Sequence, residues 1–117
     1  MHNPIDALIA VKGVLLADGA TGTNLFAMGL EAGEAPELWN ETAPEKITAL
    51  HRNFVDAGAD IILTNSFGGT RHRLKLHHAQ DRVHAINEKA ARIRLSKCLV
   101  RVRIVSVALS TRYMSPA

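Results

Sequence analysis

The segment that decides the fold reads DIILTNSFGGT, residues 60–70. Its apolar Ile-Ile-Leu run is typical of a buried strand, and the small and polar residues after it are typical of a turn. The same pattern occurs earlier in VLLADGATGT, residues 14–23. A helical pattern follows each segment. Apolar strands that alternate with helices predict an α/β fold with a parallel sheet covered on both faces, whose strands end at one common edge.

Short elements are expected in the first part of the chain. Residues 14–17 lie between a glycine and an Asp-Gly pair and are predicted as a buried strand. A short helix is predicted through residues 24–28, with Thr21 or Thr23 as its N-cap. Residues 31–41 contain glycine, proline and several carboxylates, so we expect an exposed loop there.

Two longer helices are expected on either side of the second strand. Thr42-Ala43-Pro44-Glu45 has the spacing of a capping box with a proline just inside the helix. Apolar residues at helical spacing then predict two buried stripes, and Gly58 suits the end of the first helix. The stripes are Ile47, Leu50, Phe54 and Val55 in the first helix and Val83, Ile86, Ala90 and Ile93 in the second.

The length and the charge distribution bound the function. A chain of 117 residues is at most one small domain. The net charge of +3 is unevenly spread, because residues 1–88 carry 7 Lys and Arg against 11 Asp and Glu, whereas residues 89–117 carry 7 Lys and Arg and no acid. A basic tail can bind nucleic acid or an anionic surface. The tail has no aromatic residue between its basic ones beyond Tyr113, so nucleic-acid binding is not expected.

The compartment can also be inferred from the composition. No run approaches the roughly 18 apolar residues of a membrane span, and the N-terminus lacks a basic region followed by an apolar one. Cys98 is the single cysteine, which excludes an internal disulfide and fits a reducing compartment. We therefore expect a cytoplasmic protein with no membrane partner.

The character of the chain changes after Ile93. Residues 94–107 alternate basic and apolar side chains, a pattern that taken alone could be an amphipathic strand. The turn and the third strand that a βα pattern places here are not recognisable. One hypothesis is that the reading frame was lost near Arg94, and the nucleotide sequence downstream would decide it.

The motifs at residues 18–23 and 58–71 closely resemble the homocysteine S-methyltransferase family. That family includes betaine–homocysteine methyltransferase and the homocysteine-binding module of cobalamin-dependent methionine synthase. The resemblance runs from about Ile5 to Ile93 and implies an eight-stranded (β/α) barrel, of which this chain would hold about two βα units. Residues 1–93 would then be a partial homocysteine-binding barrel and residues 94–117 a tail outside the family.

The resemblance also implies a reaction, the transfer of a methyl group to the homocysteine thiolate to give methionine. Family members hold the thiolate on a zinc ion bound by three cysteines, because a free thiol with a pKa of about 8.5 is mostly protonated at neutral pH. Those cysteines lie on strands that this chain lacks, and Cys98 is in neither context. We therefore expect no catalytic residue, metal site or cofactor in this chain, and an isolated chain that is inactive and poorly folded. The sequence does not name the methyl donor or the oligomeric state.

Four residues are candidates for the substrate pocket. The resemblance places Asp18 where the family receives the homocysteine ammonium group, and Thr64 and Asn65 where it lines the amino-acid pocket. Gly19 would allow the backbone to approach the ligand closely, as would the glycine pair at 68–69. An alternative for Asp18 and Asn65 is plain turn chemistry at a strand end.

Two further interpretations remain open at this point. Four histidines lie close together in the sequence and could bind a metal, although solvated helix positions explain them better: His72, His77, His78 and His84. The chain could also be a non-catalytic α/β module that binds a partner through its basic tail, which deletion of the residues after Ile93 would test.

Overall fold

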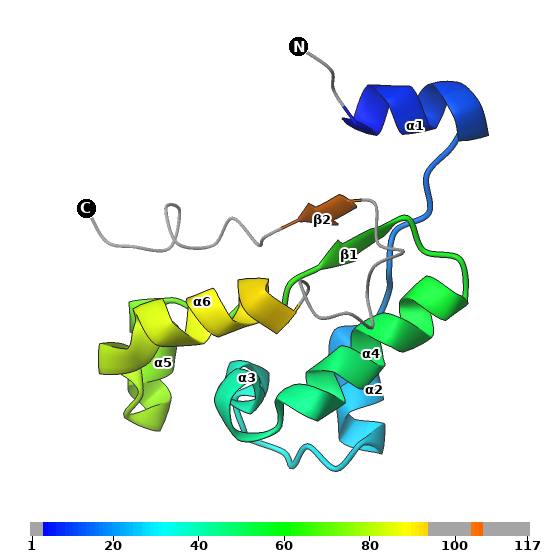
Figure 1. Ribbon diagram of the computed structural model, residues 1–117. Helices are drawn as coiled ribbons and strands as arrows, with labels where there is room; N and C mark the ends of the chain where they lie inside the picture. Colours follow the sequence, from blue (N-terminus) through cyan, green and yellow to red (C-terminus); the bar gives the residue numbers. More distant parts are fainter. Residues whose placement is uncertain (1–3, 94–103, 107–117) are drawn as a thin grey trace.

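The computed structural model describes residues 4–93 and 104–106, and it places β1 (Ile61–Leu63) at the centre of three parallel segments (Figure 1). β2 (Ile104–Ser106) pairs with β1 in parallel, with Ile62 opposite Val105. Ala17 forms a single parallel bridge to Ile61. The Ile61 N–H donates to the Leu16 carbonyl oxygen, and the Ile61 carbonyl oxygen accepts from the Asp18 N–H. β1 therefore lies between this segment and β2.

Helices account for most of the described chain (Figure 1). Short 3-10 turns connect several of them. The helices are α1 (Pro4–Lys12), α2 (Thr21–Ala27), η1 (Pro36–Leu38), α3 (Trp39–Thr42), α4 (Pro44–Asp56), α5 (Arg71–Leu74), η2 (Lys75–His77), η3 (Gln80–Arg82) and α6 (Val83–Ile93). No helix in these described ranges is long and apolar enough to cross a membrane.

The two predicted stripes are confirmed as the core of the molecule. Ile47 and Leu50 of α4 are buried in a cluster with Leu25, Trp39 and Ile93. A second cluster joins Leu74, Ala79 and Ile86, with Val83 packed at its edge. Gly58, predicted to end the first helix, follows α4 with φ +108°, a backbone conformation that glycine adopts without strain. The helical spacing of apolar residues was therefore a sound guide to burial.

The prediction of a buried strand over residues 14–17 is wrong. The segment forms one bridge instead of a ladder, and the side chains of Val14 and Leu16 are 76% and 56% exposed. The described helices cover one face of the sheet, where Ile62 packs against Phe54 and Val55 of α4. The register of Ala17 with Ile61 puts Leu16 on that face too, but Leu16 lies outside this cluster and stays exposed, as does Leu63 on the opposite face. The expected sheet with two covered faces is half formed in the described residues.

The predicted loop at residues 31–41 is also wrong in its second half. η1 and α3 lie there, and Glu37, Trp39 and Asn40 are buried. Pro36 is typical of a loop, but here it occupies the first turn of η1. Backbone N–H groups in the first turn of a helix have no partner within the helix, so the N–H that proline lacks is not needed there. The indole of Trp39 joins the main core cluster and lies under the Lys46 ammonium, 4.6 Å from the ring centroid.

The helix caps differ from the predicted ones. Neither Thr21 nor Thr23 caps α2, which follows Ala20, and α4 follows Ala43 without a side-chain cap. Thr42 belongs to α3 instead, and its hydroxyl donates back to the Leu38 carbonyl oxygen at 3.2 Å. The cap that forms is Thr70, whose Oγ1 accepts from the Arg73 N–H at 3.1 Å.

β2 corrects the expectation that no third strand follows the second helix. Ile104–Ser106 runs parallel to β1, and its two β-branched residues, Ile104 and Val105, favour a strand. The rest of the basic tail, with Cys98 and Tyr113, lies outside the described residues.

We expect the open sheet face to drive self-association of the 117-residue chain. Leu63 exposes apolar surface on this face, and among the described residues the outer edge of segment 14–17 pairs with no strand; such surfaces associate. Leu63→Thr should weaken association several-fold, roughly the effect of losing part of one buried apolar side chain, in sedimentation velocity. Leu76→Ser is the control, because Leu76 is equally apolar but lies on η2. Equal effects of Leu63→Thr and the control would contradict the assignment of this face.

Candidate functional site

The carboxylate of Asp18 lies at the carboxyl end of the first parallel segment and is held there by the backbone. Its Oδ2 accepts a hydrogen bond from the Leu63 N–H at 3.0 Å. Its Oδ1 is buried and has no hydrogen-bond partner among residues 4–93 and 104–106. One oxygen therefore fixes the carboxylate against β1, and the other remains available for a donor.

A buried histidine on α4 lies within electrostatic reach of this carboxylate. His51 is 2% exposed, and neither ring nitrogen has a hydrogen-bond partner in the described part of the chain. Burial lowers the pKa of His51, and the nearby Asp18 carboxylate partly offsets that by raising it. The imidazole is therefore neutral near pH 7. His51 is not among the predicted site residues, because a lone histidine in a helix carries no signal of its own.

The strand-end residues Thr64 and Asn65 are buried, and their side chains bond inside the protein. Thr64 Oγ1 and Ser66 Oγ are 2.8 Å apart. Asn65 Nδ2 donates to the Pro36 carbonyl oxygen at 2.8 Å and to Asn40 Oδ1 at 2.9 Å. Both amide hydrogens of Asn65 are thus used to hold η1 and α3 against the end of β1, which is the turn chemistry that the alternative interpretation describes.

Asn40 completes this hydrogen-bond network and is not among the predicted site residues. Its Nδ2 donates to the Asn65 carbonyl oxygen at 2.9 Å and to the Ile86 carbonyl oxygen at 3.2 Å. It therefore joins α3, the end of β1 and α6 in one buried network. Its position inside a segment predicted as a loop hid this role.

The glycines near the site differ in what surrounds them. A Cβ at Gly19 would make ordinary contact with Phe54 Cε1 at 3.5 Å, so the structure has room for one. A Cβ at Gly68 would collide with the Glu37 carboxylate, and one at Gly69 would lie 2.8 Å from Asn87 Oδ1. The close approach at residues 68–69 is thus to side chains of the chain itself.

Glu37 is the second buried acid of this region, in a segment predicted to be exposed. Burial raises the pKa of Glu37, and this is partly offset by hydrogen bonds from its own backbone N–H and that of Gly68, and by the charges of Arg73 and His77. Its carboxyl group packs under the turn after β1 and stabilises that turn.

The described residues do not fit the zinc site that the resemblance implies. No group of three His, Cys, Asp or Glu side chains able to hold a metal occurs within residues 4–93 and 104–106. This includes the four histidines considered above, and Cys98 lies outside the described ranges. No step of the chemistry is therefore assigned to zinc on these residues.

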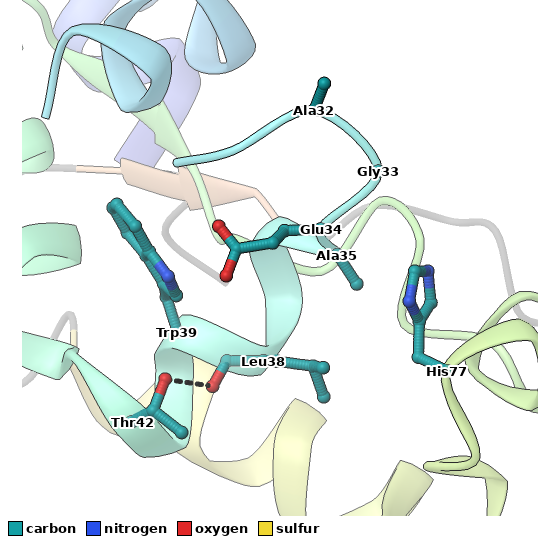
Figure 2. Close-up of a pocket in the computed structure, with 8 residues that line it drawn as sticks. All are labelled: Ala32, Gly33, Glu34, Ala35, Leu38, Trp39, Thr42 and His77. Atoms are coloured by element: carbon teal, nitrogen blue, oxygen red, sulfur yellow. Dashed lines mark hydrogen bonds between the residues drawn. The ribbon is translucent and has the colours of Figure 1, made fainter. Parts of the chain in front are cut away.

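A separate hollow of about 520 Å³ lies between the turn at residues 32–35 and η2 (Figure 2). Figure 2 shows Trp39 and His77 at its two sides, with the Glu34 and Ala35 side chains between them. Glu34 Oε2 already accepts from the Glu31 N–H at 2.7 Å. The hollow contains none of the predicted site residues, and its polar groups do not converge on one point, so Asp18 remains the candidate centre.

Known proteins with similar sequences are named methionine synthase or homocysteine S-methyltransferase. The chain is 35% identical over 86 residues to methionine synthase of Mycobacterium tuberculosis, covering 68% of this chain and 7% of that protein. It is 34% identical over 73 residues to homocysteine S-methyltransferase of Escherichia coli, covering 59% of this chain and 23% of that protein. The chain thus spans less than a quarter of either relative.

A solved structure and a family profile agree with these relatives. The crystal structure of the oxidized homocysteine methyltransferase MmuM of Escherichia coli matches with a TM-score of 0.62 and 30% identity, covering 80% of this chain and 35% of that one. The profile described as homocysteine S-methyltransferase matches residues 15–112, and so reaches past Ile93, where a boundary is predicted. Two motifs, a shared fold and a continuous profile match lead to one conclusion: the chain belongs to the homocysteine S-methyltransferase family.

Proposed function

We propose that this chain forms the amino-acid end of a homocysteine pocket, with Asp18 receiving the ammonium group. The enzyme would transfer a methyl group to the homocysteine thiolate and release methionine. The observation that carries the proposal is the buried Oδ1 of Asp18, which has no partner in the described chain although Oδ2 is bonded. Buried carboxylate oxygens are seldom left without a donor.

An ammonium group suits this oxygen for chemical reasons. It has three N–H donors and no acceptor, whereas a carboxylate only accepts. The bond between them is charge-assisted, which makes it roughly twice as strong as a neutral one. The Leu63 N–H on Oδ2 orients the carboxylate before the ligand arrives. Gly19, Thr64 and Asn65 border this position in the chain and would form the pocket wall.

We further propose that the described elements are the first βα units of an eight-stranded barrel. The order along the chain supports this, since residues 16–18, α4, β1, α6 and β2 alternate strand and helix. The three extended segments are parallel and adjacent in sequence order, as right-handed βαβ units require. The open sheet face then corresponds to the inside of the barrel.

The thiol chemistry is assigned to no residue of the described part. Zinc coordination supplies a thiolate at neutral pH in enzymes of this type. Asp18 binds and orients the other end of the amino acid and leaves the thiol free to reach such a centre. The cytoplasmic location remains a prediction.

Binding of homocysteine can be tested by NMR on the ¹⁵N-labelled chain. We expect the Leu63 amide to shift on addition of homocysteine, because its N–H bonds the carboxylate that receives the ammonium group. The affinity should be near the millimolar range, as befits one charge-assisted contact. Asp18→Asn should abolish the shift, and Asp56→Asn, at an exposed position of α4, should not.

The ammonium assignment has its own control in the same titration. 4-Mercaptobutanoate has the thiol and the carboxylate of homocysteine but no amino group. We expect it to leave the Leu63 amide in place. An equal shift with both compounds would show that Asp18 is not the ammonium site.

The 117-residue chain on its own should not make methionine. Asp18 can hold the amino acid, but the described residues offer no group that lowers the pKa of its thiol. The assay supplies homocysteine, zinc and deuterated S-methylmethionine or betaine, and mass spectrometry measures labelled methionine. The Escherichia coli homocysteine S-methyltransferase is the positive control. Zinc-dependent methionine formation by the chain would contradict this prediction.

A further inference from the structure

His51 is a nearly fully buried imidazole whose two ring nitrogens have no hydrogen-bond partner among the described residues. It takes no part in the proposed contact with the ammonium group. It projects from the middle of α4, the helix that packs against both α2 and β1. Neither Nδ1 nor Nε2 has a hydrogen-bond partner in the described residues, and the ring is 2% exposed. A neutral imidazole offers one donor and one acceptor, and burying both without partners is costly.

The same region contains a third unsatisfied polar atom, Asp18 Oδ1, because the next residue, Gly19, lies against the ring of Phe54, one turn along α4 from His51. The Asp18 carboxylate is the charged group that acts on the imidazole.

Other charged side chains lie on α3 and α6, while α2 and β1 have none. Glu41 of α3 pairs with Arg82 at 3.1 Å, and Glu88 of α6 pairs with Arg92 at 2.9 Å. Lys89 of α6 is exposed and lines a surface hollow with Thr48 of α4.

We propose that His51 is a positioning residue for Asp18, donating its N–H through one buried water molecule to Asp18 Oδ1. Direct bonding is not the arrangement, because the two groups make no hydrogen bond in the structure. A water molecule can accept from the imidazole N–H and donate to the carboxylate, which satisfies both groups at once. This inference rests on the proposed function, since it concerns the residue that receives the ammonium group.

The arrangement leaves Asp18 able to bind its ligand. A carboxylate has about four lone-pair positions, and the Leu63 N–H and the bridging water occupy two of them. The side chain is then held from two sides, by β1 and by α4. His51 would fix which way the remaining lone pairs point.

The coupling can be tested in the free chain by titrating ¹⁵N-labelled imidazoles. We expect the pKa of His51 to lie below its ordinary value, and Asp18→Asn to lower it further, because the Asp18 carboxylate raises it. Glu88→Gln, at an acid of α6 that pairs with Arg92, is the matched control and should leave the His51 titration unchanged. If Asp18→Asn leaves the His51 titration unchanged, the inference fails, whatever homocysteine does.

The positioning role predicts a distinct pattern in homocysteine binding. His51→Leu should weaken binding about tenfold, the effect of losing one hydrogen-bonded support, and His51→Gln should restore it to within about threefold. A merely structural histidine would give equal losses in both variants. If the unaltered chain does not bind homocysteine, but Asp18→Asn still changes the His51 titration, the proposed function alone is overturned. If His51→Leu does not fold, the Asp18→Asn titration decides.

The pH dependence of stability tests the premise that the buried imidazole is neutral. Folding lowers the pKa of His51 from 6.5. As the pH falls through 6.5, His51 is therefore protonated in the unfolded chain before it is protonated in the folded chain. The free energy of unfolding of His51→Gln minus that of the unaltered chain should therefore grow from pH 7 to pH 5. The contribution of Glu37 to the pH dependence of stability cancels in this difference, because both chains contain Glu37. A difference independent of pH would overturn the inference.

Discussion

The backbone hydrogen bonds that hold residues 16–18 against β1 are the constraint on which the candidate site depends. The Leu16 carbonyl oxygen accepts from the Ile61 N–H at 3.1 Å, and the Ile61 carbonyl oxygen accepts from the Asp18 N–H at 2.9 Å. This register places the Asp18 carboxylate beside the Leu63 N–H. A slip of one residue would turn Asp18 to the other face of the sheet, because side chains alternate along an extended chain. The register therefore determines the site.

Asp60 holds the same two segments together at their amino ends. Its Oδ2 accepts from the Leu16 N–H at 3.1 Å, and its Oδ1 pairs with the Lys12 ammonium of α1. One carboxylate thus anchors the start of the first segment and ties α1 to the sheet. Asp60 and Asp18 bind backbone at opposite ends of the same pair of segments, and the difference between them is that Asp18 keeps one buried oxygen without a partner in the described residues.

The turn after β1 shows how polar residues at a strand end divide between structure and function. The Asn65 amide clasps α3, and the glycine backbone at 68–69 makes room for the Glu37 and Asn87 side chains. These groups stabilise the turn through buried hydrogen bonds. Of the predicted site residues, Asp18 is the one whose geometry points to a ligand. Residue type alone did not separate the two roles, because asparagine and glycine serve both.

Local patterns in the sequence were enough to predict β1 between two helices, the apolar stripes of α4 and α6, the glycine that ends α4 and the position of Asp18 at the end of an extended segment. These follow from periodicity and backbone preference, which need no distant partner. Long-range packing settled that Val14 and Leu16 stay exposed, that η1 and α3 replace a loop and that His51 lies near Asp18. Each of these depends on which surfaces meet across long stretches of chain, and burial, unlike periodicity, is a property of the assembled fold.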